Sequence, residues 1–130
     1  MKLQKNRLQQ SGLTLIEVTL VIAVLLGLIS VLCVGVEAYK KGSDRAKCVL
    51  NISTVQKAAR SYQNLYELKM GDDLAVADIA GAGKMIESTP VCPADGSYTF
   101  GTTVPSAGST YLTCSLGSSD GHQPSSTAGW

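Results

Sequence analysis

The chain has 130 residues, of which 45% are hydrophobic and 16% are charged, and its formal net charge is +1. This length is that of a small single-module protein and argues against a large core with a buried active site. A charge so close to neutral also argues against a dedicated nucleic-acid-binding surface, so no specific nucleic-acid partner is predicted.

The chain begins with a short, polar and basic leader, residues 1–12, which contains no acid. An apolar run follows at residues 13–36. At 1.5 Å per residue this run forms about 36 Å of helix, enough to cross a hydrocarbon core of about 30 Å. A secretory cleavage site would follow the apolar stretch, whereas the small residue Gly12 precedes it. Cleavage at Gly12 would therefore leave a transmembrane anchor on the mature protein.

Glu17 places a carboxylate a few residues inside this apolar run. An ionised carboxylate in the hydrocarbon core costs at least a few kcal/mol, so such an acid indicates a functional site with a partner. The alternative is that Glu17 lies near the membrane interface and snorkels to water.

The helix is predicted to continue beyond the membrane as a spine at residues 37–70, with a possible break at Gly42 and a stop at Gly71. Apolar residues recur here at alternating spacings of four and three, which predicts one buried stripe. The stripe consists of Cys48, Ile52, Val55, Ala59, Tyr62 and Tyr66.

A small β-rich head is predicted at residues 71–116, opening with a short helix within residues 72–80 that Asp72 or Asp73 caps. Two stretches rich in β-branched and aromatic residues follow, at residues 97–100 and 110–113. They predict an antiparallel hairpin or small meander that covers the helical stripe. The predicted fold is α+β, with a long N-terminal helix packed against a small antiparallel sheet.

Residues 117–130 are rich in Ser, Gly and Pro, which predicts a flexible surface tail with Trp130 exposed at its end. The tail contains His122, the only histidine of the chain. With this histidine in a mobile tail there is no set of nucleophile, base and orienting group, so an enzyme is not expected and no cofactor is predicted. No metal site is predicted either, because the chain has no Cys-x-x-Cys pair.

The four cysteines allow three complete pairings, but Cys33 lies inside the apolar anchor. Cys92 and Cys114 flank the β region and are the best candidates for a disulfide, which would stabilise a small domain by about 3 kcal/mol. Cys48 lies on the helical stripe, either as a free buried thiol or bridged to the β region.

The segment Ser11-Gly12-Leu13-Thr14-Leu15-Ile16-Glu17-Val18 resembles the processing site of class III signal peptides, found on type IV pilins and type II secretion pseudopilins. The resemblance implies cleavage between Gly12 and Leu13 by a prepilin peptidase, usually with N-methylation of Leu13. It implies that Glu17 neutralises the amino terminus of a neighbouring subunit in the filament core. Leu13 replaces the commoner phenylalanine, and the helix lacks the proline that many relatives carry.

More loosely, Cys92–Tyr98 together with Thr113-Cys114-Ser115 resembles the heads of small, competence-like pilins and pseudopilins. Some major pseudopilins hold calcium in a C-terminal loop, but Asp120 is the only acid in this tail, so that site is not carried over.

The resemblance implies a structural subunit of a type IV pilus-like or pseudopilus filament. Such a subunit waits in the bacterial inner membrane, in contact with lipid, with its leader in the cytoplasm and its head outside. An assembly platform and its ATPase then build it into a periplasmic or surface filament, as a homo-oligomer or with other pilins. These filaments serve adhesion, motility, secretion or DNA uptake. The alternative is a membrane-anchored extracytoplasmic binding module that never polymerises.

Overall fold

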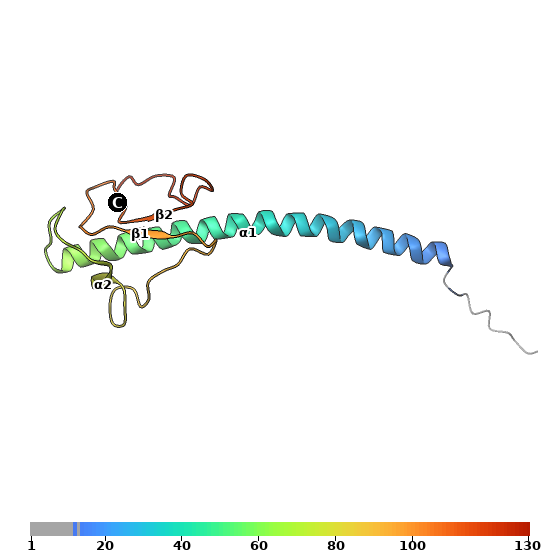
Figure 1. Ribbon diagram of the computed structural model, residues 1–130, viewed down its shortest axis with the longest axis horizontal. Coiled ribbons are helices and arrows are strands. Elements are labelled where there is room, and N and C mark those ends of the chain that lie inside the picture. Colours follow the sequence, from blue (N-terminus) through green and yellow to red (C-terminus); the bar gives the residue numbers. More distant parts are fainter. Residues whose placement is uncertain (1–11, 13) are drawn as a thin grey trace, which may run out of the picture. The chain divides into compact units, whose positions relative to one another are not determined.

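The computed structural model describes residue 12 and residues 14–130. The elements follow in the order α1 (Leu15–Leu65), α2 (Val76–Ile79), β1 (Tyr98–Phe100) and β2 (Leu112–Cys114) (Figure 1). The chain divides into two compact units, one ending at Ala38 and the other formed by Tyr39–Trp130, which we call the head. The α+β organisation is confirmed. Most of the predicted leader and the predicted first mature residue, Leu13, lie outside the described residues.

The first part of α1 exposes its apolar side chains from Leu15 to Val36. It is long and apolar enough to cross a membrane, as the sequence predicts for an anchor. The break predicted at Gly42 is wrong, because α1 continues through this residue. A glycine costs only about 1 kcal/mol in a helix interior, which the hydrogen bonds of a long helix readily offset.

The predicted stripe of α1 forms one side of the core of the head. Cys48, Ile52, Val55 and Ala59 are buried, as predicted, against residues from the loops and the sheet. Tyr66 is 58% exposed, so its predicted burial is wrong. Tyr66 remains on the face of Tyr62, since its N–H donates to the Tyr62 carbonyl at 3.0 Å and the ring centroids are 4.3 Å apart, but the core extends only as far as Tyr62 on this face.

α1 ends at Leu65 and does not reach Gly71, where the sequence predicts the stop. Glu67 adopts a left-handed conformation with φ of 53°, and the backbone N–H of Leu68 donates to the carbonyl of Gln63 at 2.9 Å. This is the hydrogen-bond pattern of a Schellman C-cap, in which glycine normally takes the left-handed position. The predicted stop at Gly71 is wrong because Glu67, and not a glycine, takes the left-handed position that ends the helix.

The short helix after the spine is confirmed as α2, but its predicted N-cap is wrong. Ala75 is the N-cap, and the backbone N–H of Ala75 donates to the Asp78 carboxylate at 3.0 Å. Asp72 instead stabilises the preceding turn, since its carboxylate accepts the backbone N–H of Lys69 at 2.7 Å.

β1 and β2 pair in antiparallel fashion, as predicted, with Tyr98 opposite Cys114 and Phe100 opposite Leu112. The backbone N–H of Gly101 donates to the Tyr111 carbonyl at 2.7 Å and continues the pairing beyond the strands. The sheet is too small to form a core by itself, so the head relies on packing against α1.

A buried glutamine on α1 fixes the chain at the start of β2. The Gln56 side chain accepts the backbone N–H of Tyr111 at 2.8 Å and donates to the carbonyl of Ser109 at 3.0 Å. The Tyr111 hydroxyl donates to the Leu74 carbonyl at 2.7 Å. These bonds join the helix, the α2 region and the sheet in one unit.

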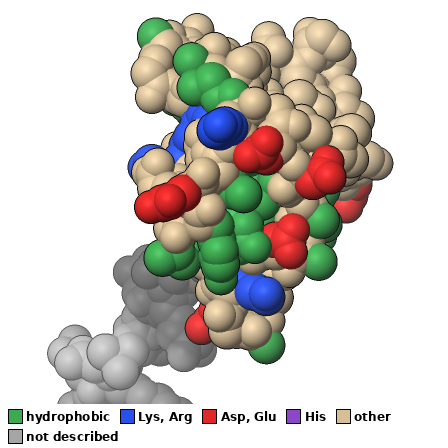
Figure 2. Space-filling model, turned by 90° about the vertical axis from the view of Figure 1, so that its left-hand side faces the viewer, with side chains coloured by type: hydrophobic (Ala, Val, Ile, Leu, Met, Phe, Trp, Pro, Cys, Tyr) green, Lys and Arg blue, Asp and Glu red, His purple; other side chains and the backbone are tan. Residues whose placement is uncertain are grey.

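The surface of the molecule also has a pattern. Figure 2 shows hydrophobic side chains gathered between acidic ones on one face of the molecule.

Tyr111→Phe tests the contribution of this buried hydroxyl. The substitution leaves the Leu74 carbonyl without its donor in a core where Tyr111 is only 2% exposed. We expect the free energy of unfolding to fall by about 1–3 kcal/mol, measured by urea titration of the full chain in detergent. Tyr39→Phe is the matched control, because Tyr39 is 80% exposed, and it should leave the unfolding midpoint unchanged. Equal midpoints for both variants would contradict the prediction.

Candidate metal centre and N-terminal motif

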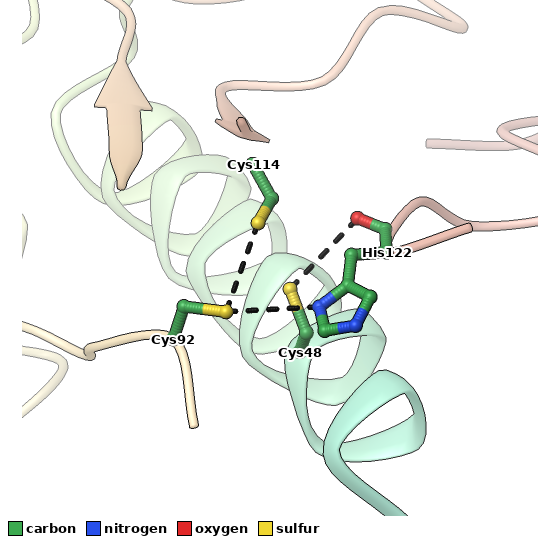
Figure 3. A group of neighbouring side chains, drawn as sticks. All are labelled: Cys48, Cys92, Cys114 and His122. Atoms are coloured by element: carbon green, nitrogen blue, oxygen red, sulfur yellow. Dashed lines mark hydrogen bonds between the residues drawn. The ribbon is translucent and has the colours of Figure 1, made fainter. Parts of the chain in front are cut away.

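Four side chains with metal-binding atoms meet inside the head, from four separate parts of the chain (Figure 3). Cys48 comes from α1, Cys92 from the loop after α2, Cys114 from the end of β2, and His122 from the C-terminal segment. Their ligand atoms all lie within 4.8 Å of one another.

The sulfur of Cys92 lies close to two other members of the cluster. It is 3.8 Å from the Cys114 sulfur and 3.6 Å from Nδ1 of His122 (Figure 3). The Cys48 sulfur lies 3.8 Å from the backbone carbonyl oxygen of His122 and 3.3 Å from the Tyr98 hydroxyl. All the donors therefore face one common point.

His122 is 3% exposed, so the prediction that it lies in a flexible surface tail is wrong. The backbone N–H groups of Asp120 and His122 both donate to the Leu116 carbonyl, at 3.1 Å and 3.2 Å, and this turn returns the chain to the core. Gly121 permits the turn with φ of 69°, and a Cβ on this glycine would lie only 2.9 Å from Cζ of the Arg45 guanidinium. Trp130 is also partly buried against the core, whereas the sequence predicts an exposed end.

The turn that follows Cys92 shapes the electrostatics of its sulfur. Burial opposes ionisation of the thiol, but hydrogen bonds from the backbone of Ala94 and Gly96 outweigh it and lower the pKa of Cys92 below its ordinary value. Asp95 closes the turn with φ of 59°. A Cβ on Gly96 would lie 3.1 Å from the Cys92 sulfur, so glycine lets the backbone approach the sulfur closely.

Cys48 has the opposite tendency. Burial raises the pKa of its thiol to about 12, although the hydroxyl of Tyr98, which donates to the sulfur, opposes the rise. The same burial raises the pKa of Tyr98 above its ordinary value. Asn51 holds the tyrosine in place, because its side-chain amide donates to the Tyr98 hydroxyl at 3.1 Å.

The fold brings together the two cysteines that the sequence pairs. Cys92 and Cys114 are free thiols in the structure, with sulfurs adjacent but not bonded, so their disulfide stays a prediction. Cys48 lies in the same group, while Cys33 is exposed in the N-terminal unit. The expectation of no metal site relied on the missing Cys-x-x-Cys pair and on the position of His122 in a Ser/Gly-rich tail. The cluster contradicts that expectation, because the fold brings together four possible metal ligands that are far apart in the sequence.

Within the N-terminal motif, Thr14 and Glu17 form hydrogen bonds that the sequence analysis did not predict. The backbone N–H and the hydroxyl of Thr14 donate to Oε2 of Glu17, at 3.2 Å and 3.3 Å. The backbone N–H of Glu17 in turn donates to the Thr14 hydroxyl at 3.3 Å. This reciprocal arrangement is a capping box at the start of α1, with the recognisable signature Thr-x-x-Glu. Gly12, the predicted cleavage position, is exposed and has open space around it.

No family model matches this chain, and neither a curated protein nor a solved structure is significantly similar to it.

Proposed function

We propose that this chain is a pilin-like structural subunit that assembles into a filament through the N-terminal part of α1. The observation that carries the proposal is the single carboxylate of Glu17 at the start of an apolar helical segment whose described side chains are exposed. Lipid covers such a surface before assembly, and the helices of other subunits cover it afterwards.

The fold supports this proposal because α1 serves two purposes. Its segment up to Val36 is long and apolar enough for a membrane, while Cys48 to Ala59 are buried in the core of the head. A subunit of this design can leave the membrane and keep its head folded, because each of the two units has its own contacts.

Processing would create the charge that Glu17 needs. Cleavage between Gly12 and Leu13 removes the basic leader and places a new amino group four residues before the carboxylate. An ion pair between this amine and Glu17 of a neighbouring subunit would spare both charges an unpaired position in an apolar filament core. Prepilin peptidase, the inner-membrane assembly platform and its ATPase are the partners that this route requires, with the head on the extracytoplasmic side.

We expect the mature protein to begin at Leu13, with or without a methyl group on its amine. Intact mass and N-terminal sequencing of protein from membranes measure this directly. Gly12→Leu is expected to retain the leader, and this bulkier side chain meets no atom of the described fold within 4 Å of its Cβ. Gly42→Leu, also at a glycine with open surroundings and without a positive φ, should be cleaved normally. A mature chain that keeps Met1, or that begins beyond Val36, would exclude the proposed route.

A further inference from the structure

We propose that Cys48, Cys92, Cys114 and His122 bind one Zn²⁺ ion, which acts as a structural centre of the head. The proposal goes beyond the filament function and does not depend on it. It uses residues of the head alone, whereas assembly uses the N-terminal part of α1.

The spacing of the ligand atoms agrees with a tetrahedral zinc site. Zinc bonds of about 2.3 Å to sulfur and about 2.05 Å to nitrogen at tetrahedral angles separate two sulfurs by about 3.8 Å and a sulfur from a nitrogen by about 3.6 Å. The structure has 3.8 Å between Cys92 and Cys114 and 3.6 Å between Cys92 and Nδ1 of His122. All other pairs of ligand atoms lie within 4.8 Å, so small movements complete the tetrahedron.

The donor set determines the class of metal and its role. Three sulfurs and one imidazole form a closed structural zinc site, with no position left for a substrate or water. The set contains no carboxylate, whereas calcium and magnesium take oxygen ligands. Soft sulfur donors in a tetrahedral arrangement favour zinc among the common divalent ions. The ion would therefore hold elements together and carry out no reaction.

Surrounding groups provide the contacts that such a site needs. Zn²⁺ with three thiolates and a neutral imidazole has a net charge of −1. The backbone at Gly96 approaches the Cys92 sulfur closely, and the Tyr98 hydroxyl donates to the Cys48 sulfur at 3.3 Å. The Arg45 guanidinium beside Gly121 adds a positive charge near the histidine. Partners of this kind orient metal ligands and tune their affinity.

Zinc binding and the predicted disulfide between Cys92 and Cys114 are different chemical states of the same thiols. Zinc binding is not a redox step: three thiols release three protons, and His122 binds through Nδ1 with its proton on Nε2. A disulfide instead removes two electrons and two protons from the two thiols and needs an oxidant. Because both use the same sulfurs, one chain cannot contain both.

The first test is the metal content of the full chain, purified in detergent without chelators or metal-affinity resin. We expect one zinc per chain by elemental mass spectrometry and four reactive thiols after unfolding with a chelator. Cobalt added in place of zinc should give intense visible bands of tetrahedral Co²⁺ and a sulfur-to-cobalt charge-transfer band. A metal-free chain that binds no cobalt, or a Cys92–Cys114 disulfide with only two reactive thiols, would overturn the proposal.

Variants identify the ligands. Cys92→Ser and His122→Ala should each lose the bound zinc and change the cobalt spectrum, whereas Cys33→Ser, outside the cluster, should match the wild type. The zinc stoichiometry and the cobalt spectrum of the wild-type chain test the proposal without any variant. A variant that misfolds therefore does not weaken the test. Zinc that persists at full stoichiometry in both ligand variants would also overturn the proposal. A wild-type chain that binds zinc but never forms filaments would count against the proposed function alone.

Discussion

Replacing Glu17 with glutamine is expected to abolish filaments while leaving the membrane pool of the protein and the start of α1 intact. Glutamine can keep the hydrogen bonds of the capping box with Thr14, because its carbonyl oxygen accepts as the carboxylate does. It cannot neutralise an amino terminus. Removing one partner of a buried ion pair costs about 3–5 kcal/mol, which lowers association by roughly 150- to 4,000-fold per contact.

The measurement is the ratio of sheared surface filaments to membrane-bound subunit, by immunoblot and electron microscopy. Glu17→Ala serves as the comparison, because it removes both the charge and the capping interaction. Glu37→Gln is the matched control, since it removes an exposed carboxylate from the same helix beyond the apolar run. We expect Glu17→Gln and Glu17→Ala to lack filaments and Glu37→Gln to have them.

The pattern of results separates the charge of Glu17 from its capping role. Normal filaments with Glu17→Gln but not with Glu17→Ala would assign Glu17 to the start of the helix alone. Normal filaments with both variants would contradict any role in assembly. A wild-type chain that never forms filaments would favour the membrane-anchored binding module.

The sequence predicted those parts of the fold that local patterns determine. The long apolar run and the spacing of Cys48, Ile52, Val55 and Ala59 predicted the helix and its buried face, and two stretches rich in β-branched and aromatic residues predicted the strand pair. The end of α1 was missed because the left-handed position is occupied by Glu67, a residue rarely found there. Helix ends depend on a few backbone angles that composition does not specify.

The candidate metal centre could be predicted only in part. Cys48 was placed on the helix face that meets the β region, and Cys92 and Cys114 were placed beside each other, so three donors could have been combined. His122 was missed because Ser, Gly and Pro around it indicate a flexible segment. The turn at Leu116 and the left-handed Gly121 return that segment to the core through long-range contacts, which no local pattern records. The Thr-x-x-Glu capping signature, by contrast, was readable in the sequence.

Removing the metal is expected to destabilise the head strongly. The cluster joins α1, the loop after α2, β2 and the C-terminal segment, so the ion would link parts of the chain that β1 and β2 alone do not hold. An ion at a free concentration about 1,000 times its dissociation constant stabilises the folded state by about 4 kcal/mol. For a domain of 60–100 residues this corresponds to a rise in Tm of roughly 16–32 °C.

Trp130 provides the signal for this measurement because it is the only tryptophan and packs against the core. Its backbone carbonyl accepts a hydrogen bond from the Arg60 guanidinium at 3.2 Å. Its fluorescence should therefore report on the return of the C-terminal segment to α1. We expect a zinc chelator to lower the Tm of the full chain in detergent, and added zinc to restore it while calcium does not.

The variants give this prediction its controls. Cys92→Ser should have a low Tm from the start and should not respond to the chelator, whereas Cys33→Ser should respond as the wild type does. A wild-type Tm that the chelator leaves unchanged would contradict a structural role for the ion. A fall in Tm that is the same in Cys92→Ser would place the effect of the chelator outside the cluster. The expected pattern would show that the small core of the head depends on the metal for its stability.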